Sequence, residues 1–460
     1  METTNLLTEK KEFNKKIFRL VLPIIIQNIL SAAISSADVL MLNYAGQDSI
    51  SAVSLASQYT SILHSVFYGL STGVTMLTAQ YFGKKDYRAI EVIEGIALRI
   101  SVASGILFGL LALCIPKQLM HIFTNDQTLI NIGADYIRCM SVAFISWAVL
   151  EVYLSILRSC NHVTVCTILS CMAFILNILF NAVFIFGLLG APKLGAKGVA
   201  IATSISRLVE LIGCIFVSVT KAEVKLKLRF IFIKNKALFQ DFIKLSLPAL
   251  LNDIIWGLGF SMYSVIIGHL GSDAVAANSF VIVARNFGTI LCFGIASAGT
   301  ILLGNVLGEG KLRQARDDGR RLMKLTVISG IAGGLIVLAA TPIILKYAAK
   351  SLSATALHYL KYMLLINSYY ISGIAVNTTL IAGVFRAGGD SKFGFICDTI
   401  DMWCYAVPLG FLSAFVFKLP VLVVYFLICT DEFVKWPWVL SHYKSEKWVK
   451  NITRDDWEQG

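Results

Sequence analysis

The sequence "GSDAVAANS" at residues 271–279 repeats the pattern of "GQDSISAVS" at residues 46–54, with Gly, Asp, Ala and Ser at the same places. We call the shift that brings residue 46 onto residue 271 the repeat offset. It also aligns Pro23 with Pro248, Ser36 with Ser261, Gly69 with Gly294 and Gly83 with Gly308. Later in each copy a slightly larger shift applies, which brings residue 156 onto residue 384 and which we call the slipped offset. It aligns "ILRSCN" at 156–161 with "VFRAGG" at 384–389, and hence Arg158 with Arg386. Because Pro and Gly recur at the same points of the hydropathy pattern, the sequence predicts two copies of one helical unit.

Long apolar stretches separate these landmarks. Of the 460 residues, 57% are hydrophobic and only 15% are charged, whereas soluble domains have roughly a quarter charged residues. A membrane-spanning helix needs about 20 mainly apolar residues. The chain has twelve such stretches: 17–42, 50–80, 92–116, 130–157, 163–189, 195–219, 240–268, 275–306, 320–346, 356–385, 393–417 and 419–442. The predicted fold class is an all-α integral membrane protein with twelve transmembrane helices.

The net charge of +12 comes from short basic runs between the apolar stretches, such as "EKKEFNKKIFRL" at 9–20 and the segment after the sixth stretch. Alternate loops, such as "NYAGQDSIS" at 43–51, contain no Lys or Arg. Since basic loops stay on the cytoplasmic side, this pattern indicates membrane topology rather than nucleic-acid binding. We expect a multi-pass protein of the plasma membrane with both termini in the cytoplasm.

Six spans per copy with the same orientation make a parallel repeat about an axis along the membrane normal. The sequence therefore predicts an N-lobe (1–220), a cytoplasmic linker (221–240), a C-lobe (241–443) and a cytoplasmic tail (444–460). Two six-helix lobes around a central cleft suit alternating access, in which one lobe rocks against the other. This organisation favours a transporter over a channel, and over a membrane enzyme with paired catalytic groups at one membrane face.

Polar side chains at membrane depth are functional candidates, because hydrocarbon penalises them. Four of them mark the N-lobe: Asp38 in the first span, Asn177 and Asn181 one turn apart in the fifth, and Thr203 in the sixth. Carboxylate, amide and hydroxyl oxygens suit a hard cation such as Na+, and a carboxylate also suits a proton. The alternatives are an interfacial Asp38 near a helix end, and amides that only join helices.

The C-lobe carries its own charged candidates. Asp253 lies near the middle of the seventh span, and Arg285 in the eighth is its predicted partner. Asp398 and Asp401 lie three residues apart on one face of the eleventh span, where two like charges disfavour joint ionisation. These acids are predicted to exchange protons or to attract a cationic substrate.

A structural role is the alternative for the two acids of the eleventh span. They would then cap the helix end and form salt bridges with Lys392 or Arg386. Asp431, Glu432 and Lys435 at the end of the twelfth span are expected to form structural ion pairs.

Motifs for enzymes and nucleotide binding are missing from the sequence. It contains no P-loop, Rossmann, GxSxG or HExxH pattern, and no polar segment long enough for a nucleotide-binding domain. Ten cysteines without a CxxC pair indicate neither a metal site nor a disulfide framework. We therefore expect a protein that is not an enzyme, without nucleotide or nucleic-acid partners, and without a cofactor other than a coupling ion, H+ or Na+.

From about residue 17 to 456 the chain resembles the multidrug and toxic compound extrusion (MATE) family, in a bacterial branch. "NAVFIFGLLGAPKLGAKGVAIATSISR" at 181–207 resembles the segment from span five to six, and "FRAGGDSKF" at 385–393 the turn from span ten to eleven. The resemblance implies two six-helix lobes with a V-shaped cleft, and export of organic cations in exchange for H+ or Na+. It also implies that Asp38, Asn177 and Thr203 belong to the N-lobe cation site. Asn181 departs from it, since many relatives have Asp there, and losing that charge weakens a Na+ site.

The function predicted is a secondary antiporter that exports amphipathic, cationic small molecules and acts in the lipid bilayer as a monomer. A flippase of a lipid-linked precursor has the same two-lobe architecture and is the alternative. A flippase needs a cationic cavity for a pyrophosphate, and the residues at mid-membrane here are mainly acidic, which favours the antiporter.

Overall fold

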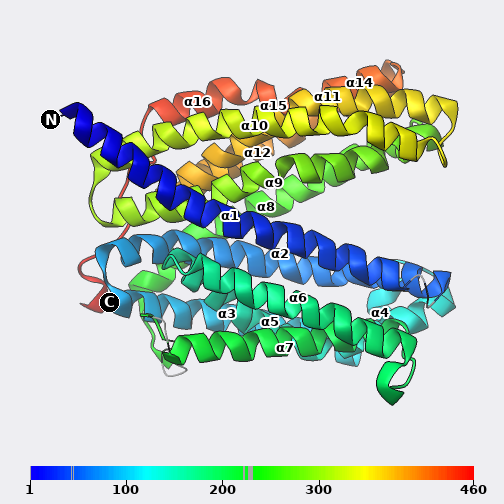
Figure 1. Ribbon diagram of the computed structural model, residues 1–460, viewed down its shortest axis with the longest axis horizontal. Helices are drawn as coiled ribbons and strands as arrows, with labels where there is room; N and C mark the ends of the chain where they lie inside the picture. The colour runs from blue at the N-terminus through cyan, green and yellow to red at the C-terminus, as the bar shows by residue number, and fades with distance from the viewer. Residues whose placement is uncertain are drawn as a thin grey trace. The chain divides into compact units, whose positions relative to one another are not determined.

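Nearly all of the described chain is helical (Figure 1). The computed structural model describes residues 2–42, 44, 46–220, 223–225, 230 and 232–459, with no strand among them. The side chains of residues 2–10, 32, 34–37, 39, 40 and 459 lie outside the description. The predicted all-α class is confirmed for the described residues.

The chain divides into two compact units. The N-unit comprises Ile26–Leu250 with Thr453–Gly460, and the C-unit comprises Met1–Ile25 with Leu251–Ile452. α1 (Glu2–Leu42) and α8 (Lys236–Gly268) each contribute to both units. The lobe boundaries predicted from the sequence stay a prediction, and residues 221, 222, 226–229 and 231 of the predicted linker lie outside the described residues.

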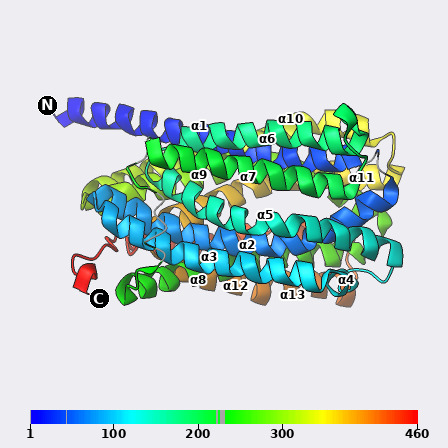
Figure 2. The same cartoon turned by 90° about the horizontal axis from the view of Figure 1, so that it is seen from below.

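In the N-unit the central helix is α5, which packs against α2, α3 and α7 (Figures 1 and 2). Phe67, Phe144 and Tyr59 are buried in the core that these helices share. The helices of this unit are α2 (Gln47–Lys84), α3 (Tyr87–Cys114), α4 (Pro116–His121), α5 (Gln127–Ser159), α6 (Val163–Phe186), η2 (Leu188–Gly190), α7 (Ala196–Thr220) and η7 (Trp457–Gln459).

In the C-unit the corresponding central helix is α11, which packs against α9 and α10. The helices of this unit are α9 (Ser272–Gly308), α10 (Leu312–Ala348), α11 (Ala354–Thr378), η4 (Thr379–Phe385), α12 (Ser391–Ile400), η5 (Asp401–Ala406), α13 (Val407–Phe411), η6 (Leu412–Val416), α14 (Val421–Ile428), α15 (Asp431–Val434) and α16 (Trp436–Lys444). η4, η5 and η6 are π-helical. Pro408 follows η5, and its ring excludes the carbonyl four residues earlier, which a widened turn accommodates.

The sequence repeat is present in the helix boundaries. α2 begins at Gln47 and α9 at Ser272, which the repeat offset aligns, and the same offset relates the starts of α3 and α10 and of α7 and α14. The residues before α2 and α9 are Gly46 with φ 100° and Gly271 with φ 119°. Side chains disfavour this backbone region, so the repeated glycines are explained by the turn that starts each helix.

The slipped part of the alignment also has a counterpart in the backbone. Asn161 and Gly389 both have positive φ, 64° and 77°, after the helical segments that carry Arg158 and Arg386. Glycine and asparagine are the residues that adopt this conformation most readily. The two segments therefore end in the same way, at positions that the slipped offset aligns.

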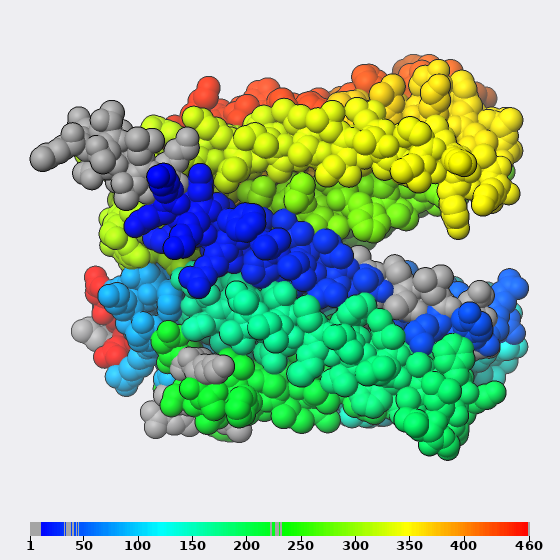
Figure 3. Space-filling view, in the orientation of Figure 1, coloured from blue at the N-terminus to red at the C-terminus, as the bar shows by residue number. Residues whose placement is uncertain are grey.

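The outer face of the N-unit is apolar. α6 and α7 lie side by side on the face seen in Figure 3, and their exposed side chains include Ile168, Ile175, Leu179, Leu208, Ile212 and Phe216. Exposed apolar side chains in this number are suited to lipid rather than water. Within the described residues, ten helices are long and apolar enough to cross a membrane.

The twelfth predicted span, 419–442, is broken into α14, α15 and α16. Pro437 lies at the start of α16 and cannot donate a backbone hydrogen bond, so the helix is interrupted before it. Asp431 and Glu432 begin α15, Lys435 lies between α15 and α16, and all three are buried. The break thus presents charged side chains to the interior of the C-unit.

Candidate functional site

The four polar residues predicted for the N-lobe form one chain of hydrogen bonds in the N-unit. Asn181 Nδ2 on α6 donates to Asp38 Oδ1 on α1 at 2.6 Å and to Asn177 Oδ1 at 3.2 Å. Asn177 Nδ2 in turn donates to Thr203 Oγ1 on α7 at 3.2 Å. The structure therefore brings together side chains from three helices, and one of these is a carboxylate.

This chain of hydrogen bonds leaves an oxygen free for a cation. Asn177 and Asn181 are buried, whereas Asp38 is partly buried. Asn181 Oδ1 has no hydrogen-bond donor among the described residues, and an unsatisfied buried oxygen costs about 1–3 kcal/mol. With the oxygens of Asp38, Asn177 and Thr203 it makes an all-oxygen donor set that fits a hard cation such as Na+. A proton on Asp38 is compatible with the same geometry.

A second polar network lies nearer the start of α6. Gln27 Nε2 donates to Ser170 Oγ at 3.5 Å, and Ser170 Oγ donates to Glu210 Oε1 at 3.0 Å. Glu210 also pairs with Arg207 at 3.0 Å, one turn earlier on α7. This network holds one buried carboxylate with one guanidinium, so its charges balance.

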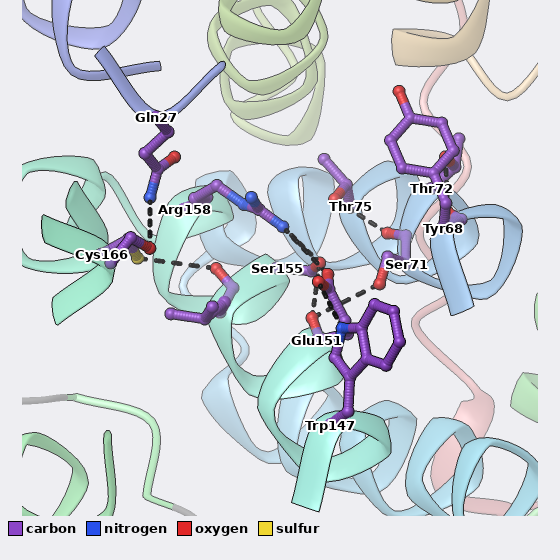
Figure 4. A network of polar contacts seen from close by, with 12 residues as sticks. Gln27, Tyr68, Ser71, Thr72, Thr75, Trp147, Glu151, Ser155, Arg158 and Cys166 are labelled. Carbon is purple, nitrogen blue, oxygen red and sulfur yellow. Dashed lines mark hydrogen bonds and ion pairs between the residues drawn. The ribbon is translucent and has the colours of Figure 1, made fainter. Parts of the chain in front are cut away.

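Arg207 connects this network to α5. Its guanidinium lies 5.4 Å from the ring centre of Trp147, whose Nε1 donates to Glu151 at 3.3 Å. Figure 4 shows Glu151 between Trp147 and Arg158, with Arg158 4.0 Å away and also bonded to Ser155. Glu151 thus has a structural partner on its own helix.

In the C-unit, the structure pairs Asp253 with Arg386 and not with Arg285. Arg386 Nη2 donates to Asp253 Oδ1 at 2.7 Å and to Asn252 Oδ1 at 3.0 Å. Arg285 lies 4.7 Å above the Phe260 ring instead. The predicted partner was wrong because depth along a helix does not determine the direction in which a side chain points.

Asp398 and Asp401 share one ammonium group. Lys435 Nζ donates to Asp398 Oδ1 at 3.0 Å and forms ion pairs with Glu432 at 3.2 Å and Asp401 at 3.4 Å. The sequence alternatives for this pair were Lys392 and Arg386, whereas the ion-pair partner in the structure is Lys435. All four side chains are at least nine-tenths buried.

The two acids differ in their hydrogen bonds. Asn252 Nδ2 donates to Asp398 Oδ2 at 2.7 Å, so both Asp398 oxygens are bonded. Neither oxygen of Asp401 accepts a hydrogen bond within the described residues. Asp398 is therefore fixed by donors from α8 and from Lys435, while Asp401 is held only by a longer ion pair.

The neighbouring carboxylates have their own donors. Asp431 Oδ2 accepts from the hydroxyls of Tyr263 at 2.6 Å and Tyr370 at 3.2 Å. Glu432 Oε2 accepts from Asn377 Nδ2 at 2.6 Å. Asn252, Asn377 and the two tyrosines were missed from the sequence, since neutral polar residues are common in spans and only their contacts reveal a role.

The networks of the two units occupy equivalent positions in the repeat. The repeat offset aligns Lys435 with Glu210 and Glu432 with Arg207, so the order of the charges in this pair is reversed. It also aligns Asn252 with Gln27. The ion pair that the sequence predicted for Glu432 and Lys435 is thus the counterpart of the Arg207–Glu210 pair.

The repeat is also recognised by comparison with known proteins. A family model described as MatE matches residues 23–183 and 248–412, and the starts of the two matches are the aligned residues Pro23 and Pro248. The chain belongs to the MATE family. It is a membrane transporter, as the family resemblance implied.

Relatives of the MATE family match the chain over nearly its whole length. A probable multidrug resistance protein NorM of Thermotoga maritima is 23% identical over 451 residues, which cover 97% of this chain and 96% of that protein. The uncharacterized transporter YisQ of Bacillus subtilis is 24% identical over 442 residues, covering 94% and 95%. A solved structure of a MATE protein in the bent conformation has a TM-score of 0.85 at 17% identity, covering 96% and 97%. The predicted fold class is thereby confirmed.

Proposed function

We propose that this MATE transporter is a secondary antiporter that exports organic, amphipathic cations in exchange for H+ or Na+. The single observation that carries the proposal is the 2.6 Å hydrogen bond that joins Asp38 to the buried amides of α6. It ties a carboxylate at membrane depth to an amide whose own oxygen lacks a donor among the described residues. Ionisable residues at this depth are otherwise costly and are typical of ion pathways.

The coupling ion acts at Asp38 in this proposal. A Na+ ion there is held by oxygens of Asp38, Asn177, Asn181 and Thr203, whereas H+ is held by Asp38 alone. Because Asn181 is an amide, the site carries one formal negative charge, which favours a single monovalent ion. Occupation of Asp38 by a coupling ion neutralises it and so competes with the positive charge of a substrate.

In the C-unit, the group that exchanges protons or presents negative charge to the substrate is one of the acids Asp253, Asp398 and Asp401. Arg285 takes part in the substrate site through its position over the Phe260 ring rather than through Asp253. Trp256 packs edge to face against Phe260 at 4.4 Å between ring centres, and a Trp ring binds flat cations through its face. Relatives named as probable multidrug resistance proteins support the export of drug-like small molecules.

The transporter lies in the plasma membrane with both termini in the cytoplasm and acts as a monomer. The basic runs of the sequence support this orientation. Export in this proposal uses no nucleotide, nucleic acid or cofactor, and the ion gradient alone drives it.

Efflux of ethidium from cells that produce the protein tests the proposal, with the pH gradient and external Na+ varied independently. We expect efflux to follow at least one of the two gradients and to be lost in Asp38→Asn. The matched control is Asp48→Asn, at an exposed position at the start of α2, which should retain efflux. Efflux that ignores both gradients would exclude antiport, and scrambling of a lipid-linked saccharide in vesicles would support the flippase instead.

A further inference from the structure

The repeat makes it possible to compare the second polar network of the two units position by position. In the N-unit, Ser170 on α6 lies between Gln27 and Glu210. In the C-unit, Asp398 on α12 lies between Asn252 and Lys435. The slipped offset, which relates Arg386 to Arg158, also relates Asp398 to Ser170. Both units therefore build the same three-member connection. The C-unit has the acid Asp398 where the N-unit has the hydroxyl of Ser170, and the ammonium of Lys435 where the N-unit has the acid Glu210.

Asp401 has no polar counterpart in this comparison. The slipped offset aligns it with Ala173, which is buried on α6. The N-unit network is complete without a polar group there. The connection between the helices therefore does not require Asp401, which indicates a different role for this residue.

The charges around Asp401 do not balance when every acid is ionised. Lys435 faces the three carboxylates of Asp398, Asp401 and Glu432 in the described structure, whereas the Arg207–Glu210 pair of the N-unit is balanced. Burying an uncompensated charge is costly, and a buried carboxylate avoids this cost by binding a proton.

Hydrogen bonding indicates which carboxyl group binds the proton. Asp398 and Glu432 each accept from an amide nitrogen, at 2.7 Å and 2.6 Å, in addition to their contact with Lys435. Asp401 is 5% exposed, and neither of its oxygens accepts a hydrogen bond among the described residues. Its Oδ2 nevertheless lies 3.4 Å from Lys435 Nζ. The ionised form of Asp401 is therefore the least stabilised of the three.

We propose that Asp401 is the carboxyl group of the C-unit that binds and releases a proton, and that Asp398 is a structural anchor. This inference rests on the proposed antiport and assigns the C-unit part of it to one residue. Release of the proton leaves Lys435 shared by one more ionised acid, which pulls its ammonium away from Asp398 and Glu432. Asp401 begins the π-helical turn η5, and such turns are frequent at functional sites.

The groups that face Asp401 come from several elements. α13, which packs against η5, has no titratable residue. The titratable neighbours are Cys397 and Asp398 on α12, Asp431 and Glu432 on α15, Lys435 before α16, and Tyr263 on α8.

Infrared spectroscopy of the purified full-length protein tests this assignment without a substrate. The protonated carboxyl group has its own C=O stretching band, which we expect to disappear from the wild type as the pH is raised. Asp401→Asn should lack the band, Asp401→Glu should restore it at a shifted frequency, and Asp398→Asn should retain it while unfolding at a lower temperature. A titrating band that persists unchanged in Asp401→Asn, or that is lost in Asp398→Asn alone, would overturn the inference.

Proton release on binding of ethidium provides the second readout, measured with an indicator dye in weak buffer. Asp401→Asn should release one proton fewer per protein than the wild type, and Asp398→Asn should release as many as the wild type. Equal release from Asp401→Asn and wild type overturns the inference, while gradient-driven ethidium efflux then still upholds the proposed antiport. Failure of the antiport itself would instead be seen as efflux that ignores both gradients.

Discussion

Arg386 and Arg158 occupy equivalent positions in the two copies of the repeat, but their surroundings differ. Arg386 is 4% exposed and lies 2.7 Å from Asp253, whereas Arg158 keeps 28% of its side chain exposed and lies 4.0 Å from Glu151. The same residue type has therefore become a buried ion-pair partner in one unit and a solvent-screened neighbour in the other.

Removal of each arginine should have unequal effects on stability. Arg386→Ala leaves Asp253 and Asn252 without their donor, which should lower the free energy of unfolding by about 3 kcal/mol. Arg158→Ala should cost about 0.5 kcal/mol, because its pair is long and partly exposed. Denaturant unfolding of both variants in the same detergent measures the difference, and equal losses would contradict the distinction between the two sites.

Lys435 should be essential for the stability of the cluster that it forms with Asp398, Asp401 and Glu432. Lys435→Met leaves three buried carboxylates without a cation, so we expect a loss of about 4 kcal/mol or failure to accumulate a folded protein. Lys350→Met, at an exposed position after α10, is the control and should unfold like the wild type. A thermal unfolding midpoint of Lys435→Met equal to that of the control would show that the cluster does not depend on the ammonium.

The reversed order of the charges in the two units leads to a separate prediction. Exchanging the C-unit pair, by Glu432→Lys with Lys435→Glu, reproduces the order of Arg207 and Glu210. It also places a carboxylate next to Asp398, where the N-unit has the neutral Ser170. The double variant should therefore be no more stable than Lys435→Met, and adding Asp398→Ser should recover part of the loss. Full stability of the double variant alone, measured by thermal unfolding, would mean that Asp398 is indifferent to its neighbour.

A pair outside the spans should give stability its dependence on acid pH. His162 Nε2 lies 2.6 Å from Glu223 Oε2. Burial raises the pKa of Glu223, but the hydrogen bonds from His162 and from its own backbone N–H outweigh burial and leave the pKa below its ordinary value. A lowered pKa stabilises the folded protein above the ordinary value of about 4.3 and ceases to do so as the pH falls through the folded value.

The expected size of this effect is about a few tenths of a kcal/mol, because nearly half of the Glu223 side chain is exposed and solvent screens the pair. Unfolding midpoints between about pH 6 and 3 should therefore fall slightly more steeply in the wild type than in Glu223→Gln. Glu309→Gln, at a loop position paired with Lys311, should follow the wild type. Identical slopes for the wild type and Glu223→Gln would contradict the role of the pair.

The end of the chain should protect the segment between α2 and α3. Trp457 is buried and its Nε1 donates to Asp86 at 2.8 Å, while Lys84 forms an ion pair with Asp455 at 2.6 Å. Arg454 also binds Asp241 through two nitrogens. Truncation after Ile452 should speed amide hydrogen exchange at residues 84–88 roughly tenfold or more, since a docked tail hinders local opening. Unchanged exchange there would show that the tail does not stabilise this segment.

The sequence predicted the helical membrane class and the repeat because both depend on one-dimensional patterns of apolar residues, Gly and Pro. It also selected Asp38, Asn177, Asn181 and Thr203, because polar residues at membrane depth are few. The structure joins these four residues by hydrogen bonds. It failed for Asp253, because the rotation of α8 and the turn before α12, which decide between Arg285 and Arg386, are not encoded in depth. Lys435 was expected to form a structural ion pair at the end of a span, and the structure shows it paired with Glu432 and also with Asp398 and Asp401 inside the C-unit.

Flux in vesicles that contain only the purified transporter measures antiport without other cellular proteins. A pH gradient or a Na+ gradient is imposed on vesicles loaded with ethidium, and the direction of the gradient is then reversed. We expect ethidium to move against the flow of at least one of the ions, reversal of the gradient to reverse the movement, and Asp38→Asn to abolish it. Ethidium movement that is the same under both gradients and in both directions would exclude antiport.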